Sequence, residues 1–203
     1  MYVANLCYIC DILACIKTSV TYKTFKNHTH MDAIEALITR QSVKKFIPNK
    51  MPSTALLNTI TQAATYAPSG MGRQSAIIIE ITNAQMRNKI ASLNAQFLGS
   101  TADPFYGSPV IIAVLANKKQ ATYVYDGTLV MANLLTAAHA LGLGACWIHR
   151  AKEVFACAEG QELLAQWGIE GDYEGIGFCA LGYREGELRP QKPRKENYIY
   201  KVE

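Results

Sequence analysis

Three short polar segments carry the residues best suited to hold an anionic ligand. Residues 40–45 (RQSVKK) combine three cations, an amide and a hydroxyl within six positions. Residues 67–74 (APSGMGRQ) contain two glycines, which let a backbone approach a ligand closely, beside a hydroxyl and an amide that can form hydrogen bonds. Residues 192–195 (KPRK) add further cations near the end of the chain. Because lysine and arginine groups bind phosphate well, the three segments together predict one phosphorylated ligand.

Other patterns that resemble sites lack the context that their chemistry needs. Residues 70–75 begin like a dinucleotide-binding glycine turn, but that turn must follow a strand and open a helix, and here a predicted helix precedes it. Residues 42–45 match the S-x-x-K of penicillin-recognising enzymes without the companion motifs. Cys146 and His149 have the spacing of two metal ligands but no further partners, and His139 lies in an apolar stretch that favours a packing role. The sequence therefore predicts no metal site and no catalytic nucleophile or acid–base residue.

Apolar periodicity defines the elements that must position the three segments. A helix capped by Ser53 ends before Pro68, and the isoleucine-rich run at 77–81 predicts a strand buried on both faces. Long helices that alternate with strands indicate a layered α/β or α+β fold. Helices are predicted at about 31–41, 54–67, 84–98, 122–141 and 152–167, strands at 77–81, 109–115, 145–148 and 173–183, and a β-like tail at 198–202.

The composition indicates one well-cored domain. Of the 203 residues, 50% are hydrophobic and 18% are charged, which excludes a disordered chain. The formal charge of +4 is mild, and it suits a small anionic ligand better than nucleic acid, which needs a large basic face.

Residues 1–30 are predicted to be an N-terminal extension outside the fold formed by 31–203. Their apolar run is shorter than the roughly 20 residues of a membrane span, and the lysines follow it rather than precede it as in a secretory signal. Cys7, Cys10 and Cys15 lack the fourth thiolate of an iron–sulfur cluster. The six cysteines form no disulfide framework, so we expect reduced thiols and a cytoplasmic protein.

From residue 31 onward the sequence resembles the FMN-dependent nitroreductase family. The resemblance implies an α+β fold, a nitroreductase-like three-layer α/β/α sandwich with a mainly antiparallel central sheet. It also implies an intertwined homodimer that holds two FMN molecules at its interface, with the C-terminal segment reaching across the partner. Six segments occur in the family's order: 40–46 (RQSVKKF), 67–75 (APSGMGRQS), 106–118 (YGSPVIIAVLANK), 125–150 (YDGTLVMANLLTAAHALGLGACWIHR), 173–183 (YEGIGFCALGY) and 192–195 (KPRK).

The resemblance also assigns cofactor-binding roles to individual residues. The family has Asn in many members where Gly72 stands, and Pro followed by an aromatic residue where residues 75 and 76 stand, so the chain departs from the pattern there. The Lys44 ammonium is the group expected to stabilise the reduced flavin. The assigned residues are Arg40, Gln41, Ser42 and Lys44 for the phosphate, ribityl chain and pyrimidine edge; Pro68, Ser69, Gly72 and Gln74 near the isoalloxazine; Ile148 and His149 at the strand end whose backbone N–H approaches flavin N5; and Lys192 and Arg194 for the phosphate.

The resemblance implies an oxidoreductase in which NADH or NADPH reduces FMN and a nitroaromatic, quinone or similar small molecule reoxidises it in a ping-pong cycle. Because the flavin supplies the redox chemistry, no catalytic triad is needed. One alternative is a different flavin enzyme on the same scaffold, a metabolite dehydrogenase or a dehalogenase-like member, whose substrate would be set by a lid between residues 84 and 106. The other is a flavin-binding protein without activity. No nucleic acid and no membrane partner is expected.

Overall fold

The computed structural model describes residues 31–203, so the predicted extension with Cys7, Cys10 and Cys15 lies outside the described residues. The described part contains both helices and strands, in alternation along most of its length. In chain order the elements are α2 (Ala33–Thr39), α3 (Thr54–Thr65), the 3₁₀ turn η1 (Gly70–Gly72), β1 (Ala76–Ile81), α4 (Ala84–Leu98), β2 (Val110–Asn117), α5 (Tyr123–Ala140), β3 (Gly144–Ile148), α6 (Ala151–Ala156), α7 (Ala158–Gln166) and β4 (Tyr173–Gly182).

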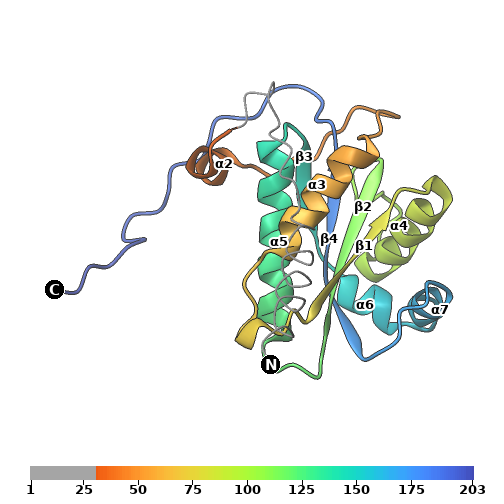
Figure 1. The fold of residues 1–203 in the computed structure, drawn as a ribbon. Helices are drawn as coiled ribbons and strands as arrows, with labels where there is room; N and C mark the ends of the chain where they lie inside the picture. Colours follow the sequence, from red (N-terminus) through yellow and green to blue (C-terminus); the bar gives the residue numbers. More distant parts are fainter. Residues whose placement is uncertain (1–30) are drawn as a thin grey trace, which may run out of the picture. The chain divides into compact units, whose positions relative to one another are not determined.

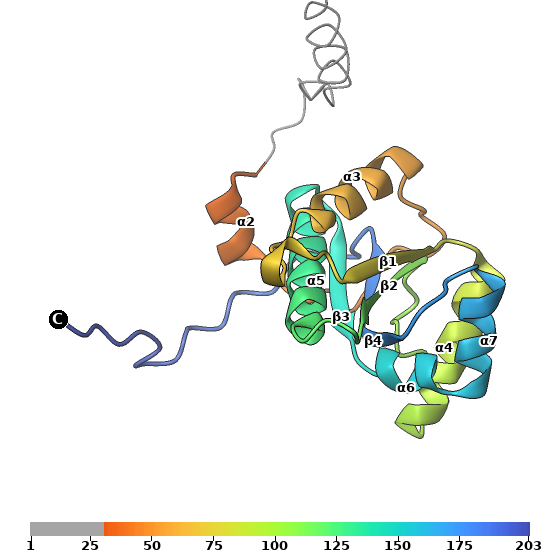
Figure 2. The same ribbon diagram turned by 60° about the horizontal axis from the view of Figure 1, so that its bottom comes forward.

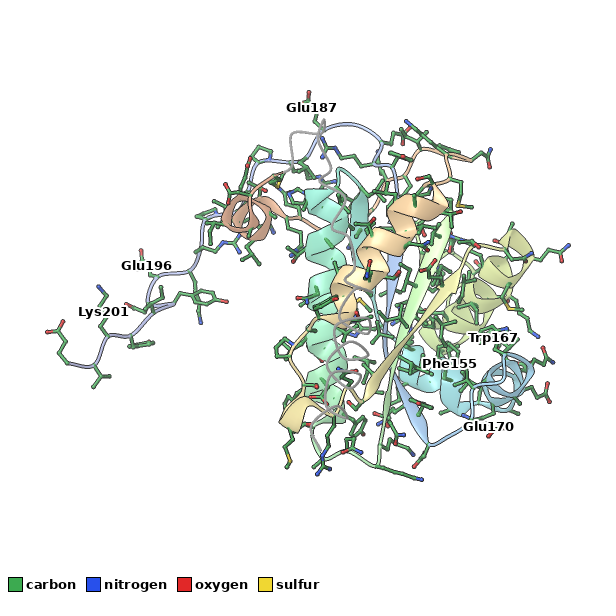
Figure 3. All side chains as sticks on the ribbon, viewed as in Figure 1. Phe155, Trp167, Glu170, Glu187, Glu196 and Lys201 are labelled. Carbon is green, nitrogen blue, oxygen red and sulfur yellow. The ribbon has the colours of Figure 1, made fainter. Side chains whose placement is uncertain are left out.

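The strands form one antiparallel sheet in the order β1-β2-β4-β3. Helices α3 and α5 cover one face of the sheet, and α4, α6 and α7 cover the other (Figure 1). Each face has its own apolar cluster; Phe155 of α6 packs edge-on against Trp167 after α7, with ring centroids 6.4 Å apart (Figure 3). This arrangement confirms the three-layer α/β/α sandwich with an antiparallel sheet.

Polar side chains that accept hydrogen bonds from first-turn N–H groups define where three helices begin. The Asp32 carboxylate accepts from the first N–H groups of α2, the Ser53 hydroxyl accepts from Leu56 N–H at 3.3 Å, and the Asn83 amide oxygen accepts from Met86 N–H at 2.9 Å. The bounds of α4 agree with the predicted helix at 84–98, since Asn83 caps its start and Gly99 ends it in the left-handed conformation (φ 67°).

Four sequence predictions need correction. Strand β1 is only half-buried, because it is an edge strand with a neighbour on one side alone. The predicted helix at 152–167 is two helices that meet at Cys157, where Gly160 packs so closely on the Val154 carbonyl that no side chain fits. Of the predicted lid between residues 84 and 106, the part at 84–98 is helix α4, which buries Ile90 and Leu93 in the core.

The fourth correction concerns the predicted β-like tail. Residues 198–202 form no strand in the described chain, and Tyr198, Ile199 and Tyr200 are 66–81% exposed. The C-terminal segment runs away from the sandwich in both views (Figure 1, Figure 2), and the side chains of Glu196 and Lys201 project from it (Figure 3). A β-rich pattern needs a sheet edge to pair with, and the tail pairs with none among residues 31–203. No helix of the described residues is long and apolar enough to cross a membrane.

Candidate functional site

A strongly basic cavity lies beside α2 and under the C-terminal segment. Its volume is about 880 Å³, and its lining contains seven Lys or Arg residues against two Glu residues. Six of the predicted cofactor-binding residues come together here from the two ends of the domain: Arg40, Gln41, Ser42, Lys44, Lys192 and Arg194.

The edge of β3 holds the first of these segments in place. Ser42 pairs with Ala145 as a parallel bridge, and Val43 N–H donates to the Ala145 carbonyl at 2.9 Å. Gly144 permits this approach, because a Cβ there would lie 2.7 Å from a Val43 methyl group. The backbone of residues 42–44 is therefore fixed along the outer edge of the sheet.

Two side-chain amides tie the C-terminal segment to α2. Gln41 Nε2 donates to the Arg189 carbonyl at 2.7 Å, and Gln191 donates to the Ile38 carbonyl. These bonds bring Lys192 and Arg194 to the same cavity as Arg40. One N–H of the Gln41 amide is thus engaged within the protein, and its oxygen and its second N–H remain available to a ligand.

Burial sets the direction of two pKa shifts beside the cavity, and the positive charges of the cavity contribute less. Burial raises the pKa of the Cys146 thiol, while Ser42 and the charges of Lys44 and Arg40 act in the opposite direction. Burial, and after it the charges of Arg40 and Arg184, lower the pKa of His139, whose Nε2 lies 2.8 Å from the Thr39 hydroxyl. His139 is therefore a packing residue that joins α2 to α5, as its apolar surroundings predict.

The end of β3 lies along the same edge of the sheet. His149 is exposed four residues after Ala145, a distance of about 13 Å at about 3.3 Å per residue. The Ile148 side chain is buried in the core, so only its backbone can meet a ligand. A ligand with an anionic end at residues 40–44 and a ring at 148–149 would lie parallel to β3.

The loop at 67–75 is shaped by left-handed residues and anchored by a buried carboxylate. Met71, Gly72 and Gln74 have φ values of 55°, 67° and 49°. Asp126 accepts hydrogen bonds from Gly70 N–H at 2.9 Å and from the Ser75 hydroxyl at 2.6 Å. Such a strained loop, held from outside, is typical of functional sites.

The loop and the basic cavity lie far apart in the chain's fold. Thr39 contacts His139 near the end of α5, whereas Gly70 contacts Asp126 near its start. These helix positions are about 20 Å apart at 1.5 Å per residue. Pro68, Ser69, Gly72 and Gln74 therefore do not join Arg40 in one chain, and Ser69 and Gln74 line a separate cavity of about 680 Å³ beside α3 and β1.

Several residues around these sites carry no signal in the sequence. Arg184 and Arg189 line the basic cavity, but they follow β4 in a segment without a recognisable motif. Asp126 and Asn94 are buried polar residues within helices, where the helical pattern alone gives no hint of their partners. No group of three potential metal ligands occurs in residues 31–203.

A sequence profile of the nitroreductase family matches residues 37–183, which is most of the chain. The match includes the predicted site residues at 40–44, 68–74 and 148–149 but not Lys192 and Arg194. The chain belongs to the nitroreductase family. A Methanothermobacter thermautotrophicus protein named as an NADH dehydrogenase/NAD(P)H nitroreductase is 32% identical over 126 residues. That match covers 58% of this chain and 60% of the relative, so the chain spans less than two thirds of the relative's length.

Solved structures share the nitroreductase fold. A nitroreductase with bound FMN from Bacteroides fragilis has 26% identity and a TM-score of 0.77, over 85% of this chain and 100% of that one. A nitroreductase with bound FMN from Desulfitobacterium hafniense has 24% identity and a TM-score of 0.75, with the same coverage. An iodotyrosine deiodinase bound to FMN and 3-iodo-L-tyrosine has 18% identity and a TM-score of 0.63, over 83% of this chain and 98% of that one, so one fold serves more than one reaction.

Proposed function

We propose that the protein is an FMN-dependent oxidoreductase that uses NADH or NADPH to reduce nitroaromatic, quinone or similar small-molecule acceptors. The observation that carries the proposal is the basic cavity, where Arg40, Lys192 and Arg194 converge from opposite ends of a nitroreductase-family domain. A cavity of this charge fits the phosphate of FMN, because guanidinium and ammonium groups bind phosphate oxygens through charge-assisted hydrogen bonds.

The residues present fit FMN along its length. Arg40, Lys192 and Arg194 would hold the phosphate, and Lys44, whose Nζ lies 5.4 Å from the Tyr106 ring centroid, would place a fixed positive charge beside the pyrimidine edge. The backbone at Ile148 and His149 would face the ring. When bound, FMN supplies the hydride and electron transfer, and the chain binds, orients and tunes it.

We further propose that each site is completed by a second copy of the chain, in a homodimer. The loop at 67–75 lies about 20 Å along α5 from the cavity residues of its own chain, which supports its contacting the flavin of a partner's site. Apolar residues on α2 support an interface as well, since Ile34, Leu37 and Ile38 are 62–66% exposed in the protomer. Large exposed apolar surfaces of this kind mark protein contacts.

The free thiols of Cys146, Cys157 and Cys179 support our placement of the protein in the reducing cytoplasm.

Both substrates would use the same face of the flavin in turn, in a ping-pong cycle.

The test is anaerobic reduction of the purified protein after saturation with FMN and removal of unbound flavin. We expect a yellow protein whose absorbance near 450 nm, the usual position of the flavin band, is bleached by NADH or NADPH and restored by a quinone or nitroaromatic. Free FMN at the same concentration is the control. A protein that retains no FMN would overturn the proposal, and retention without bleaching would favour a binding protein without activity.

A further inference from the structure

Asn94 is a completely buried polar residue on α4, and both of its side-chain polar atoms are used. Nδ2 donates to the His149 carbonyl at 2.8 Å, and Oδ1 accepts from Arg150 Nε at 3.0 Å. The carboxamide orientation is consistent with both partners, since one offers only an acceptor and the other only a donor. The two bonds therefore fix Asn94 to the turn between β3 and α6.

That turn has an unusual backbone. Arg150 has a φ of 74°, in the left-handed region that non-glycine residues seldom adopt. Asn94 holds Arg150 at two points, because it accepts from the Arg150 side chain and donates to the carbonyl of the preceding residue, His149. Local strain that its surroundings support is a common feature of functional sites.

The two hydrogen bonds of Asn94 fix the direction of one backbone donor. The His149–Arg150 peptide is trans, so the Arg150 N–H points opposite to the His149 carbonyl. Because Asn94 draws that carbonyl toward the core, the N–H points away from the core. It has no hydrogen-bond acceptor among the residues that the structure describes.

We propose that Asn94 is a positioning residue, which holds the turn at 148–150 so that the Arg150 N–H donates to an acceptor atom of the bound flavin ring. The inference rests on the proposed function, because the turn follows the strand edge that carries Ser42 and Val43 beside the basic cavity. A ring nitrogen or carbonyl changes its acceptor strength when the flavin is reduced, so a fixed donor there alters the relative affinity for the two oxidation states.

The experiment compares Asn94→Leu, Asn94→Asp and the control Leu93→Ala in the FMN-loaded protein. Asn94→Leu removes both bonds, and ionised Asn94→Asp keeps an acceptor for Arg150 but cannot donate to the His149 carbonyl. Leu93 is buried on the same helix and forms no hydrogen bond to the turn. Melting temperature, FMN affinity and the midpoint potential of bound FMN are measured for each.

We expect both Asn94 variants to bind FMN about tenfold more weakly. We also expect the ratio of their affinities for oxidised and reduced FMN to change by about tenfold, which shifts the midpoint potential of bound FMN by about 30 mV for a two-electron couple. Leu93→Ala should lower the melting temperature and leave the potential unchanged. In the wild-type protein, hydrogen exchange at the Arg150 amide should slow when FMN binds, a readout that needs no variant to fold.

Asn94 variants with the wild-type potential, or an Arg150 amide that FMN leaves unprotected, would overturn the inference and leave the proposed function standing. A wild-type protein that retains no FMN would overturn both.

Discussion

Arg194 shows how a single side chain can identify the ligand of the basic cavity. It lies with Arg40 in the lining, while its neighbour Lys195 is absent from the lining and has its Nζ 5.2 Å from the Tyr198 ring. We expect Arg194→Ala to remove a charge-assisted bond of about 1.5–3 kcal/mol and to weaken FMN binding by roughly one to two orders of magnitude. Fluorescence titration with FMN and with riboflavin measures the effect.

The matched control is Lys195→Ala, which should leave both affinities within a factor of about two. Wild-type protein should prefer FMN strongly over riboflavin, because in our proposal the phosphate is the part of the ligand that Arg40, Lys192 and Arg194 hold. Equal affinity for the two flavins would place the phosphate elsewhere.

Substitutions of Gly72 test whether the backbone conformation of the loop at 67–75 is needed for flavin binding. Its φ of 67° lies in the left-handed region, and an added Cβ would meet nothing within 4 Å. Space is therefore available, and conformation decides the outcome. We expect Gly72→Asn to retain FMN and NAD(P)H oxidation, because Asn tolerates this region, and Gly72→Val to lose both, because a β-branched residue does not. Flavin content and turnover of the two variants measure this, and full activity in the Val variant would mean that the loop lies away from the flavin.

At the scale of elements, Asp126 links α5 to the loop before β1. Burial raises the pKa of Asp126, but hydrogen bonds from Ser75, Gly70 N–H and Thr122 outweigh it, so the net pKa lies below the ordinary 3.8. A lowered carboxyl pKa stabilises the fold above pH 3.8, and this contribution is lost as the pH falls through the folded-state pKa.

We expect Asp126→Ala to lower the free energy of unfolding by about 1–3 kcal/mol, because it leaves buried donors without an acceptor. At about 2–4 °C for each kcal/mol, melting curves resolve the change. Asp126→Asn should melt with less acid sensitivity than wild type as the pH falls below 3.8. Asp172→Asn, in an exposed ion pair with Lys118, is the control and should change little. An Asp126→Ala protein as stable as the control variant would contradict the anchoring role.

The elements show which features a sequence can predict. Strand β2 is predictable because its apolar run is buried on both sides, and α4 is predictable because Asn83 and Gly99 mark its ends. Strand β1 has a similar run of isoleucines, yet its edge position depends on strand order, which periodicity does not encode. Asn94 and Asp126 look like ordinary polar helix residues, since the partners that fix Asn94 to the turn and Asp126 to the loop lie more than 50 positions away.

At the scale of the molecule, we propose that residues 31–203 form the functional unit, since the family match and all the predicted site residues fall within them. We expect deletion of residues 1–30 to leave the melting temperature, FMN content and dimerisation unchanged. Size-exclusion chromatography with light scattering and the flavin absorbance of the deletion variant test this against the full chain. An insoluble or flavin-free deletion variant would show that the extension belongs to the fold.

The distance along α5 between Asp126 and His139 separates the loop of a chain from its own cavity. One variant can therefore be damaged in the cavity and another in the loop, and the two can be mixed. In the homodimer that we propose, Arg40→Ala damages the cavity of a copy and Gly72→Val damages its loop, so each homodimer of one variant has two impaired sites. A mixed dimer joins the intact cavity of one copy to the intact loop of the other in one of its two sites. Co-refolding equal amounts of the two impaired proteins should therefore restore full activity in about one site in four by intersubunit complementation.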